Sequence, residues 1–537
     1  MTRRSKLLLT VITVLGALLR ITSPGRIGLW RDEVQALNIA SLPTLGDITR
    51  FLYAHESHPP LFYYIEHVLG RLTGDAAASM GLMGLLASIA LVPAVWWLAS
   101  LSQVRGASTV AAALVALSVP LSFFSVELRP YAILSLLLVV GTAAFIRGCE
   151  PQSVRWRALW AGASLSLVYL HHAGAVAVMA QVLAAMVAYP GAECWRDRVR
   201  LWAPFMCVVA LGAIPDVFVL AHQSVSASYA VQHPIKILRP LRELWGISIS
   251  FPGEIALAIF GAVICALARL RTAGLGLAMS PPGTRPAFVA ATFLALVVIL
   301  TLASYRSNLL LPYVVVSMAP LGLAAAGLAI AGAVARAQRW RSVVFAEVAV
   351  VCVILSILAF VGNGKTDTDL MTQYISAESR ASDLIVLIPG TLGPSFNRAF
   401  AGRQSQIDFP VIGKISRYEF DHDFARVSSP HALRDVMDSL ASACRAGRRV
   451  WLITPVNWML AKDPPKELTA RQHGGMGQSD VARANLLERR ITQLFGAAPR
   501  RARSSPHGAG VEFLEARLWS LATEPKGTAS GAACDIS

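Results

Sequence analysis

The chain has 537 residues, of which 55% are hydrophobic and only 15% are charged. Soluble domains carry roughly 25% charged residues, so this composition excludes an ordinary soluble protein and predicts a polytopic membrane protein. The net charge of +16 does not predict a nucleic-acid partner, because many Lys and Arg residues of the apolar part of the chain lie in short loops between apolar segments, where they signal topology.

The chain starts with the basic residues Arg3, Arg4 and Lys6, followed by an apolar run from 7 to about 19. A secretory signal peptide starts in a similar way, but Leu19-Arg20 and the residues after it do not form a small-residue cleavage site. Many apolar segments follow. We therefore expect an uncleaved first membrane helix with a cytoplasmic amino end.

A helix needs about 20 apolar residues to cross the hydrocarbon core of a bilayer. With the first run, the apolar segments predict about eleven transmembrane helices, which form an all-α membrane domain over residues 1–362. The predicted spans are 7–19, 79–101, 108–125, 130–146, 157–171, 173–189, 200–221, 254–270, 286–304, 308–334 and 342–361.

Basic residues are concentrated in every second loop, which the positive-inside rule assigns to the cytoplasm. An odd number of spans then places residues 363–537 outside, which in a bacterium is the outer face of the cytoplasmic (inner) membrane. The loop residues that carry this assignment are Arg105, Arg147, Arg155, Arg157, Arg196, Arg198, Arg200, Arg269, Arg271, Arg285, Arg336, Arg339 and Arg341.

The first outer loop, residues 23–78, is long and contains two short helical patterns, at 33–42 and 61–72. In the second, apolar residues recur at helical spacing, but the segment is too short to span. We expect it to lie in the membrane interface and to cover a lipid-accessible cavity. The outer loop at 222–253 either covers the same cavity or simply connects two spans.

Residues 363–537 have the composition of a soluble domain. Strand patterns at 383–389, 449–454 and 511–519 alternate with helix patterns at 430–447 and 481–496, which predicts a small α/β domain with a disordered end. No GxGxxG or phosphate-loop motif follows these strands, so we expect no nucleotide site there.

The seven cysteines are scattered and form no CxxC pair, so no cysteine-based zinc or redox site is indicated. Cys444 and Cys534 both lie in the C-terminal domain and could pair in an oxidising compartment. The sequence leaves that pairing open.

Two adjacent carboxylates, Asp32 and Glu33, follow Trp30 at the start of the first short helix. Neighbouring helical residues point about 100° apart. At most one of them therefore faces a reacting group, while the other orients it or binds a neighbour such as Arg31. The alternative interpretation is that both are solvated acids, which the positive end of a helix favours.

His58-Pro59-Pro60 predicts a rigid turn, because each proline fixes φ and holds the residue before it extended. The turn can aim His58 into a cavity, or it can simply start the helix that follows.

Glu127, Arg129 and Tyr131 lie at the outer end of a predicted span. Charges near a membrane are costly and therefore mark candidate functional residues; the alternative is an interfacial ion pair with a tyrosine in the aromatic belt. Further polar candidates at the same face are His171, His172 and Arg306. The apolar centres of the spans carry almost no charge, which argues against a proton-coupled transporter.

These motifs resemble those of the polytopic GT-C glycosyltransferases. The likeness is to bacterial relatives of the dolichyl-phosphate-mannose protein mannosyltransferases, including the aminoarabinose transferases of lipid A and the lipopolysaccharide-core transferases of rhizobia. It covers about residues 7–335. The matching stretches are Trp30 to Ala36, His58 to Tyr63, Glu127 to Ala132 and Leu310 to Tyr313.

The resemblance implies transfer of a sugar from a polyprenyl-phosphate carrier to a glycan, lipid or protein acceptor at the outer face of the cytoplasmic membrane. An inverting transfer needs a general base, which Asp32, assisted by Glu33, could supply. It also needs groups that hold the donor and its departing phosphate. The candidates for this substrate-binding role are His58, Glu127, Arg129, Tyr131, His171 and Arg306.

No cofactor is expected, because a lipid phosphate is already a competent leaving group, and a divalent cation on Asp32 is not indicated. Two other functions stay open. A transporter or flippase for lipid-linked sugars would move its substrate without forming a glycosidic bond. A non-catalytic cell-envelope assembly protein would bind its partner through the C-terminal domain alone.

Overall fold

The computed structural model describes most of the chain in two compact units. The membrane unit comprises Met1–Gly25, Thr44–Tyr53 and Ser57–Gly362, and the sheet unit comprises Arg26–Pro43, Ala54–Glu56 and Asn363–Ser537. The described residues are 2–23, 28–56, 58–150, 152–188, 192–222, 263, 281–303, 312–336, 365–429, 431–456, 467, 478–496, 499–504 and 514–520.

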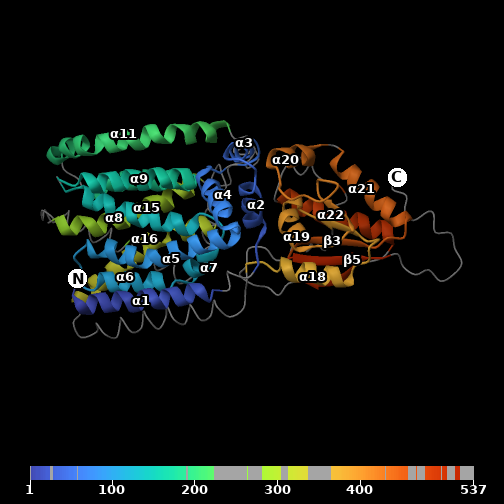
Figure 1. Ribbon diagram of the computed structural model, residues 1–537, viewed down its shortest axis with the longest axis horizontal. Coiled ribbons are helices and arrows are strands. Elements are labelled where there is room, and N and C mark those ends of the chain that lie inside the picture. Colours follow the sequence, from blue (N-terminus) through green and yellow to red (C-terminus); the bar gives the residue numbers. More distant parts are fainter. Residues whose placement is uncertain are drawn as a thin grey trace. The chain divides into compact units, whose positions relative to one another are not determined.

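The described part of the membrane unit is helical, and its long helices run alongside one another (Figure 1). Nine of the predicted spans fall mostly on described residues, and their described parts are helical apart from terminal residues and a break at residues 117 and 118. Span 342–361 and all of 254–270 except residue 263 lie outside the described residues. The helices are α1 (Arg3–Ile21), α4 (Leu61–Thr73), α5 (Ala76–Ser100), α6 (Ala107–Ala116), α7 (Val119–Phe123), α8 (Tyr131–Gly148), α9 (Val154–Leu170), α10 (Ala173–Ala188), α11 (Ala192–His222), α15 (Pro281–Ala303) and α16 (Pro312–Arg336).

Within the described residues, four helical segments are long and apolar enough to cross a membrane by themselves: Ala76–Ser100, Tyr131–Gly148, Val199–Ala221 and Arg285–Leu302. A fifth candidate is a broken span, Ala107–Ala116 followed by Val119–Val126, which bends by 53°. The chain is therefore a multi-pass membrane protein with a helical membrane domain. The number of eleven spans stays a prediction.

The bend of the broken span is stabilised by Arg20 of α1, which is completely buried. Its guanidinium donates to the carbonyls of Val115 and Ala116 at 3.0 and 2.9 Å, and to Ser88 Oγ of α5 at 2.6 Å. The last carbonyls of a helix have no partner within it and need donors from elsewhere. Arg20 supplies them where α6 ends.

The sheet unit contains a five-stranded mixed sheet in the order β2-β1-β3-β5-β4. β1 (Leu384–Leu387) pairs in parallel with β2 (Ser405–Asp408) and β3 (Val450–Pro455), whereas β5 (Leu514–Trp519) is antiparallel to β3 and β4 (Arg500–Ser504). The helices of this unit are α2 (Arg31–Ala40), α18 (Thr368–Glu378), α19 (Gly393–Ala399), α20 (Phe420–Ser428), α21 (Ala432–Arg445) and α22 (Gln478–Phe495); α3 (Leu45–His55) has residues in both units.

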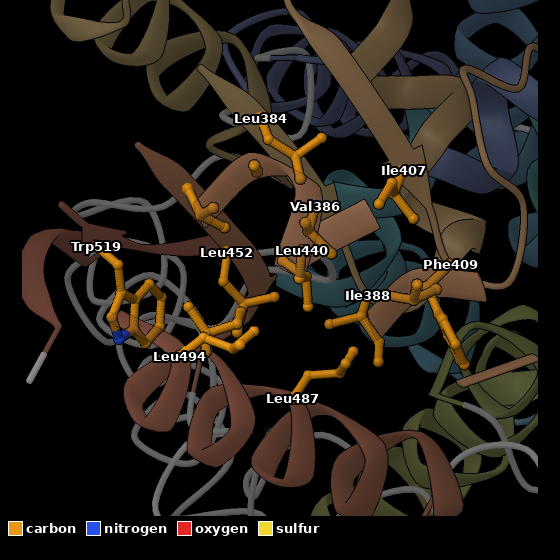
Figure 2. Close-up of a cluster of buried hydrophobic side chains, with 14 of the residues drawn as sticks. Leu384, Val386, Ile388, Ile407, Phe409, Leu440, Leu452, Leu487, Leu494 and Trp519 are labelled. Carbon is orange, nitrogen blue, oxygen red and sulfur yellow. The ribbon is translucent and has the colours of Figure 1, made fainter. Parts of the chain in front are cut away.

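The sheet has a hydrophobic core on each face, because successive residues of a strand point to opposite sides. One core joins Val386 and Leu452 to Leu440 of α21 and to Leu487 and Leu494 of α22 (Figure 2). The other lies against α18 and α19 and includes Ile385, Trp451, Ile453, Met371 and Phe396.

The predicted first outer loop, residues 23–78, is divided between the two units. Sequence patterns placed residues 23–78 with the membrane domain, but 26–43 and 54–56 group with residues 363–537. Gln35 explains this, because its side-chain amide accepts from the Tyr418 N–H at 3.2 Å and donates to the Tyr418 carbonyl at 2.9 Å. Asn38 donates to the Ser416 carbonyl at 2.5 Å, so that α2 is fixed along the segment before α20.

Candidate active site

Glu33 is part of a buried ion pair that fixes the start of α2. One carboxylate oxygen accepts from the Trp30 backbone N–H at 3.2 Å, which caps the helix. The other contacts Lys365 Nζ at 2.5 Å, and both side chains of the pair are buried, at 0% and 1% exposed. Glu33 is thus held by structural partners on both oxygens.

Asp32 points away from this pair, as the helical geometry predicts for a neighbouring residue. Its Oδ1 accepts a hydrogen bond from the Tyr418 hydroxyl at 3.2 Å and lies 3.4 Å from Arg31 Nε. The side chain remains 18% exposed. Asp32 is therefore an oriented carboxylate that solvent or a substrate can reach.

Arg129 and His58 meet in the membrane unit. Arg129 Nη2 lies 3.0 Å from His58 Nε2, and Nη1 donates to the Tyr63 hydroxyl at 3.5 Å. Arginine is a donor only, so His58 accepts on Nε2 and, when neutral, carries its proton on Nδ1. Arg129 is only 6% exposed, which gives this group a buried positive charge.

His171 joins this cluster from the end of α9. Its ring centroid lies 5.7 Å from that of His58 and 6.0 Å from that of Tyr131. The Ala173 N–H donates to His171 Nδ1 at 3.1 Å, so the neutral ring carries its proton on Nε2. We call Arg129, His58, Tyr63, Tyr131 and His171 the arginine–histidine cluster.

The arginine–histidine cluster depends on the turn between the broken span and α8. Glu127 is extended (φ −74°, ψ 136°), and Pro130 favours an extended Arg129 before α8 begins. Gly84 of α5 permits the close approach of this turn, because a Cβ there would lie 3.0 Å from the Ser125 carbonyl oxygen. Glu127 itself is buried, with 1% exposure.

Asp216 is a buried acid that the sequence analysis did not select. It lies in α11 with 4% exposure, and its Oδ2 is 3.6 Å from Nδ1 of His172. The signal was present, because a carboxylate within a predicted span (200–221) is a functional candidate by default. Among the described residues, His172 therefore pairs with Asp216 rather than with the arginine–histidine cluster.

The selected residues thus form two groups, each within its own unit. Asp32 and Glu33 lie in the sheet unit, where they contact Tyr418 and Lys365. These two partners are distant in the sequence, and no local sequence pattern predicted them. His58, Arg129, Tyr131 and His171 come together in the membrane unit. Arg306 and Cys534 lie outside the described residues, as do residues 223–253 of the second predicted outer loop.

Residues 57–218 match the family model described as dolichyl-phosphate-mannose-protein mannosyltransferase. That stretch contains the whole arginine–histidine cluster. No curated protein sequence matches the chain significantly.

Among solved structures, the fold is similar to that of the archaeal oligosaccharyltransferase AglB from Archaeoglobus fulgidus, in complex with an inhibitory peptide and a dolichol-phosphate. The TM-score is 0.50 at 13% identity, over 90% of this chain and 72% of that one. ArnT from Cupriavidus metallidurans, bound to undecaprenyl phosphate, gives a TM-score of 0.49 at 12% identity, over 98% of this chain and 100% of the other. The likeness to AglB confirms the predicted GT-C-like fold.

Proposed function

We propose that this protein is a glycosyltransferase that moves a sugar from a polyprenyl-phosphate carrier to an acceptor. The observation that carries the proposal is the buried arginine–histidine cluster, which lies within the stretch matched by the mannosyltransferase family model. The similarity in fold to AglB, a protein that holds a dolichol-phosphate, supports a lipid-phosphate donor.

The phosphate end of the donor suits the arginine–histidine cluster. When the bond between the sugar C1 and the phosphate oxygen breaks, negative charge develops on the departing lipid phosphate. The Arg129 guanidinium is permanently positive, and buried charge-assisted donors stabilise such a charge most strongly. The Nε2–H of neutral His171 is a second donor in the same cluster.

Asp32 is the proposed general base. It takes the proton from the acceptor hydroxyl while that oxygen bonds to C1 from the side opposite the phosphate, which inverts the anomeric centre. The Tyr418 hydroxyl orients the carboxylate. Glu33 supports α2 through Lys365 and does not exchange protons with the acceptor.

The proposed topology follows from the basic loops. The amino terminus is cytoplasmic, the sheet unit lies on the outer face of the cytoplasmic membrane, and eleven helices cross it. Helix α4 lies in the outer interface. The alternation of basic loops supports this arrangement.

The test is a transfer assay with the purified, reconstituted protein and radiolabelled polyprenyl-phosphate sugars in a membrane lipid extract. We expect the wild type to move label to a new product. Asp32→Asn should lose activity by a factor of about 10²–10⁴, the usual contribution of a general base, with an unchanged melting temperature. Asp47→Asn, which changes an acid of the same loop, is the matched control. Full activity of Asp32→Asn would refute the assignment of the base.

A flippase for lipid-linked sugars is the second candidate, and the buried Asp216 favours it, because acids within spans line substrate or ion paths. It predicts that label crosses the bilayer on its original carrier. This function would be supported if the label crossed the bilayer without formation of a new glycosidic bond, and did so equally in the wild type and in Asp32→Asn.

A further inference from the structure

Three side chains that could bind a metal converge in the sheet unit, apart from the acids of α2. They are His55, at the end of α3, and Glu419 and His422, at the start of α20. One ligand atom from each lies within 4.8 Å of those of the other two. The two imidazole rings are 4.9 Å apart between centroids.

We propose that His55, Glu419 and His422 form a binding site for a divalent transition metal of the zinc class. Two imidazoles and one carboxylate are a common protein ligand set for Zn²⁺, which accepts nitrogen and oxygen ligands at about 2.0–2.2 Å. His422 Nδ1 already lies 2.5 Å from Glu419 Oε2. Small side-chain adjustments would therefore bring the three ligand atoms around one ion.

Asp421 supplies the supporting carboxylate that such sites usually contain. Its Oδ1 lies 2.7 Å from His55 Nδ1, and its Oδ2 lies 3.7 Å from His422 Nε2. A carboxylate on one ring nitrogen orients the imidazole and increases its basicity as a ligand. One aspartate thus contacts both histidines.

The local charge also favours a cation. Glu419, Asp421 and Asp423 lie within five residues of chain and carry three carboxylates. Like charges so close together in the chain repel one another. A bound divalent ion would relieve this repulsion.

The metal would act as a clamp within the sheet unit. It would tie residues 54–56 to the start of α20, joining positions 55 and 422, which are distant in the chain. Metal binding that requires a folded site adds its binding free energy to stability.

The experiment measures zinc binding by the full-length, tag-free protein in detergent, after removal of metal with a chelator. ZnCl₂ is added near neutral pH, bound zinc is counted per protein after dialysis, and melting temperature is recorded with and without the ion. We expect one zinc per chain and a higher melting temperature with zinc. Co²⁺ in place of Zn²⁺ should give the visible absorption of a nitrogen- and oxygen-coordinated ion.

The variants separate this site from unspecific binding. His422→Gln, whose parent side chain is 53% exposed and tolerates change, and Glu419→Gln should lose the bound zinc and the gain in melting temperature. Asp421→Asn should bind about 10–100-fold more weakly. His431→Gln, an exposed histidine of the same unit, is the matched control and should bind like wild type.

No zinc in the wild type, or equal loss in His431→Gln and His422→Gln, would overturn the proposal. None of these measurements uses sugar transfer. The metal site and the proposed transferase function therefore succeed or fail independently.

Discussion

Asp32 and Glu33 are neighbours in the sequence but have different surroundings. Glu33 is enclosed by the Trp30 N–H and the Lys365 ammonium, whereas Asp32 contacts the Tyr418 hydroxyl and Arg31 and remains partly exposed. Neutralising one partner of a buried ion pair destabilises the folded protein, because the other partner then remains buried without a counter-charge. The two acids should therefore respond to mutation in different ways.

Glu33→Gln should lower stability rather than abolish chemistry. The change leaves Lys365 buried without its counter-charge, which costs on the order of 3–5 kcal/mol. A lower melting temperature is expected, with sugar transfer retained at temperatures where the protein stays folded. Adding Lys365→Met should restore much of the stability, since replacing both partners is often neutral. A double variant no more stable than the single one would contradict this role of the pair.

The sequence predicted that the two acids diverge, because the angle between helical neighbours is fixed by geometry. It did not predict which acid would be buried. Lys365 is 332 residues away from Glu33 and Tyr418 is 386 away from Asp32, and no local pattern encodes such pairings. Arg129 and His58 were both candidates from the sequence, but their direct contact depends on tertiary packing.

Arg20 shows how one residue of α1 determines the form of another element. It donates four hydrogen bonds, to Ser88 Oγ and to the carbonyls of Gly16, Val115 and Ala116. These bonds stabilise the end of α6, after which the chain bends by 53° and continues to the Glu127–Arg129 turn.

Arg20→Met should destabilise the membrane unit by several kcal/mol, because each buried acceptor left unsatisfied costs about 1–3 kcal/mol. We expect a clear drop in the melting temperature of the protein in detergent. Arg4→Met, which alters an exposed arginine of the same helix, is the matched control and should change it little. Similar melting temperatures for both variants would show that the bend does not depend on Arg20.

The edge strands show where sequence patterns fail at the scale of an element. The strands β1, β3 and β5 lie in the interior of the sheet and fall on the three predicted segments. The apolar runs of β1 and β3 are typical of buried strands, whereas β5 mixes apolar residues with Glu515 and Arg517. The outer strands β2 (Ser-Gln-Ile-Asp) and β4 (Arg-Arg-Ala-Arg-Ser) were not predicted. Edge strands are often short and charged, which discourages pairing with other chains. For the same reason they lack the apolar pattern by which a strand is recognised in a sequence.

Asp408, at the end of edge strand β2, should make stability depend on pH. Burial raises its pKa to about 6 from 3.8, despite hydrogen bonds from Gln406, the Ile415 N–H and Asn397. The folded state thus holds this proton more tightly than the unfolded state. The stabilisation is complete below about pH 4 and is lost as the pH rises through about 6.

The comparison that checks this is wild type against Asp408→Asn, which cannot ionise. The stability of the wild type relative to the variant should fall by on the order of 3 kcal/mol between about pH 4 and 6.5. Melting temperatures across that range measure it, and Asp435→Asn, an exposed acid on α21, controls for the loss of one carboxylate. A difference that stays constant with pH would contradict the prediction.

At the scale of the whole molecule, the first outer loop connects two differently built units. The helices of the membrane unit were predictable from the length of the apolar segments, since the thickness of the bilayer sets that length. The grouping of residues 26–43 and 54–56 with residues 363–537 was not, because it rests on contacts such as those of Gln35 with Tyr418.

The divided loop has a consequence for recombination between related proteins. The sheet unit is not a cassette that can be exchanged by a single junction near residue 362, because three separate stretches of chain build it. Consider a chimaera that takes only residues 363–537 from a relative. In it, Glu33, Gln35 and Asn38 of this protein would have to contact side chains and backbone of the relative. A compatible exchange would have to transfer 26–43 and 54–56 together with the C-terminal part, so these stretches should be inherited as one set.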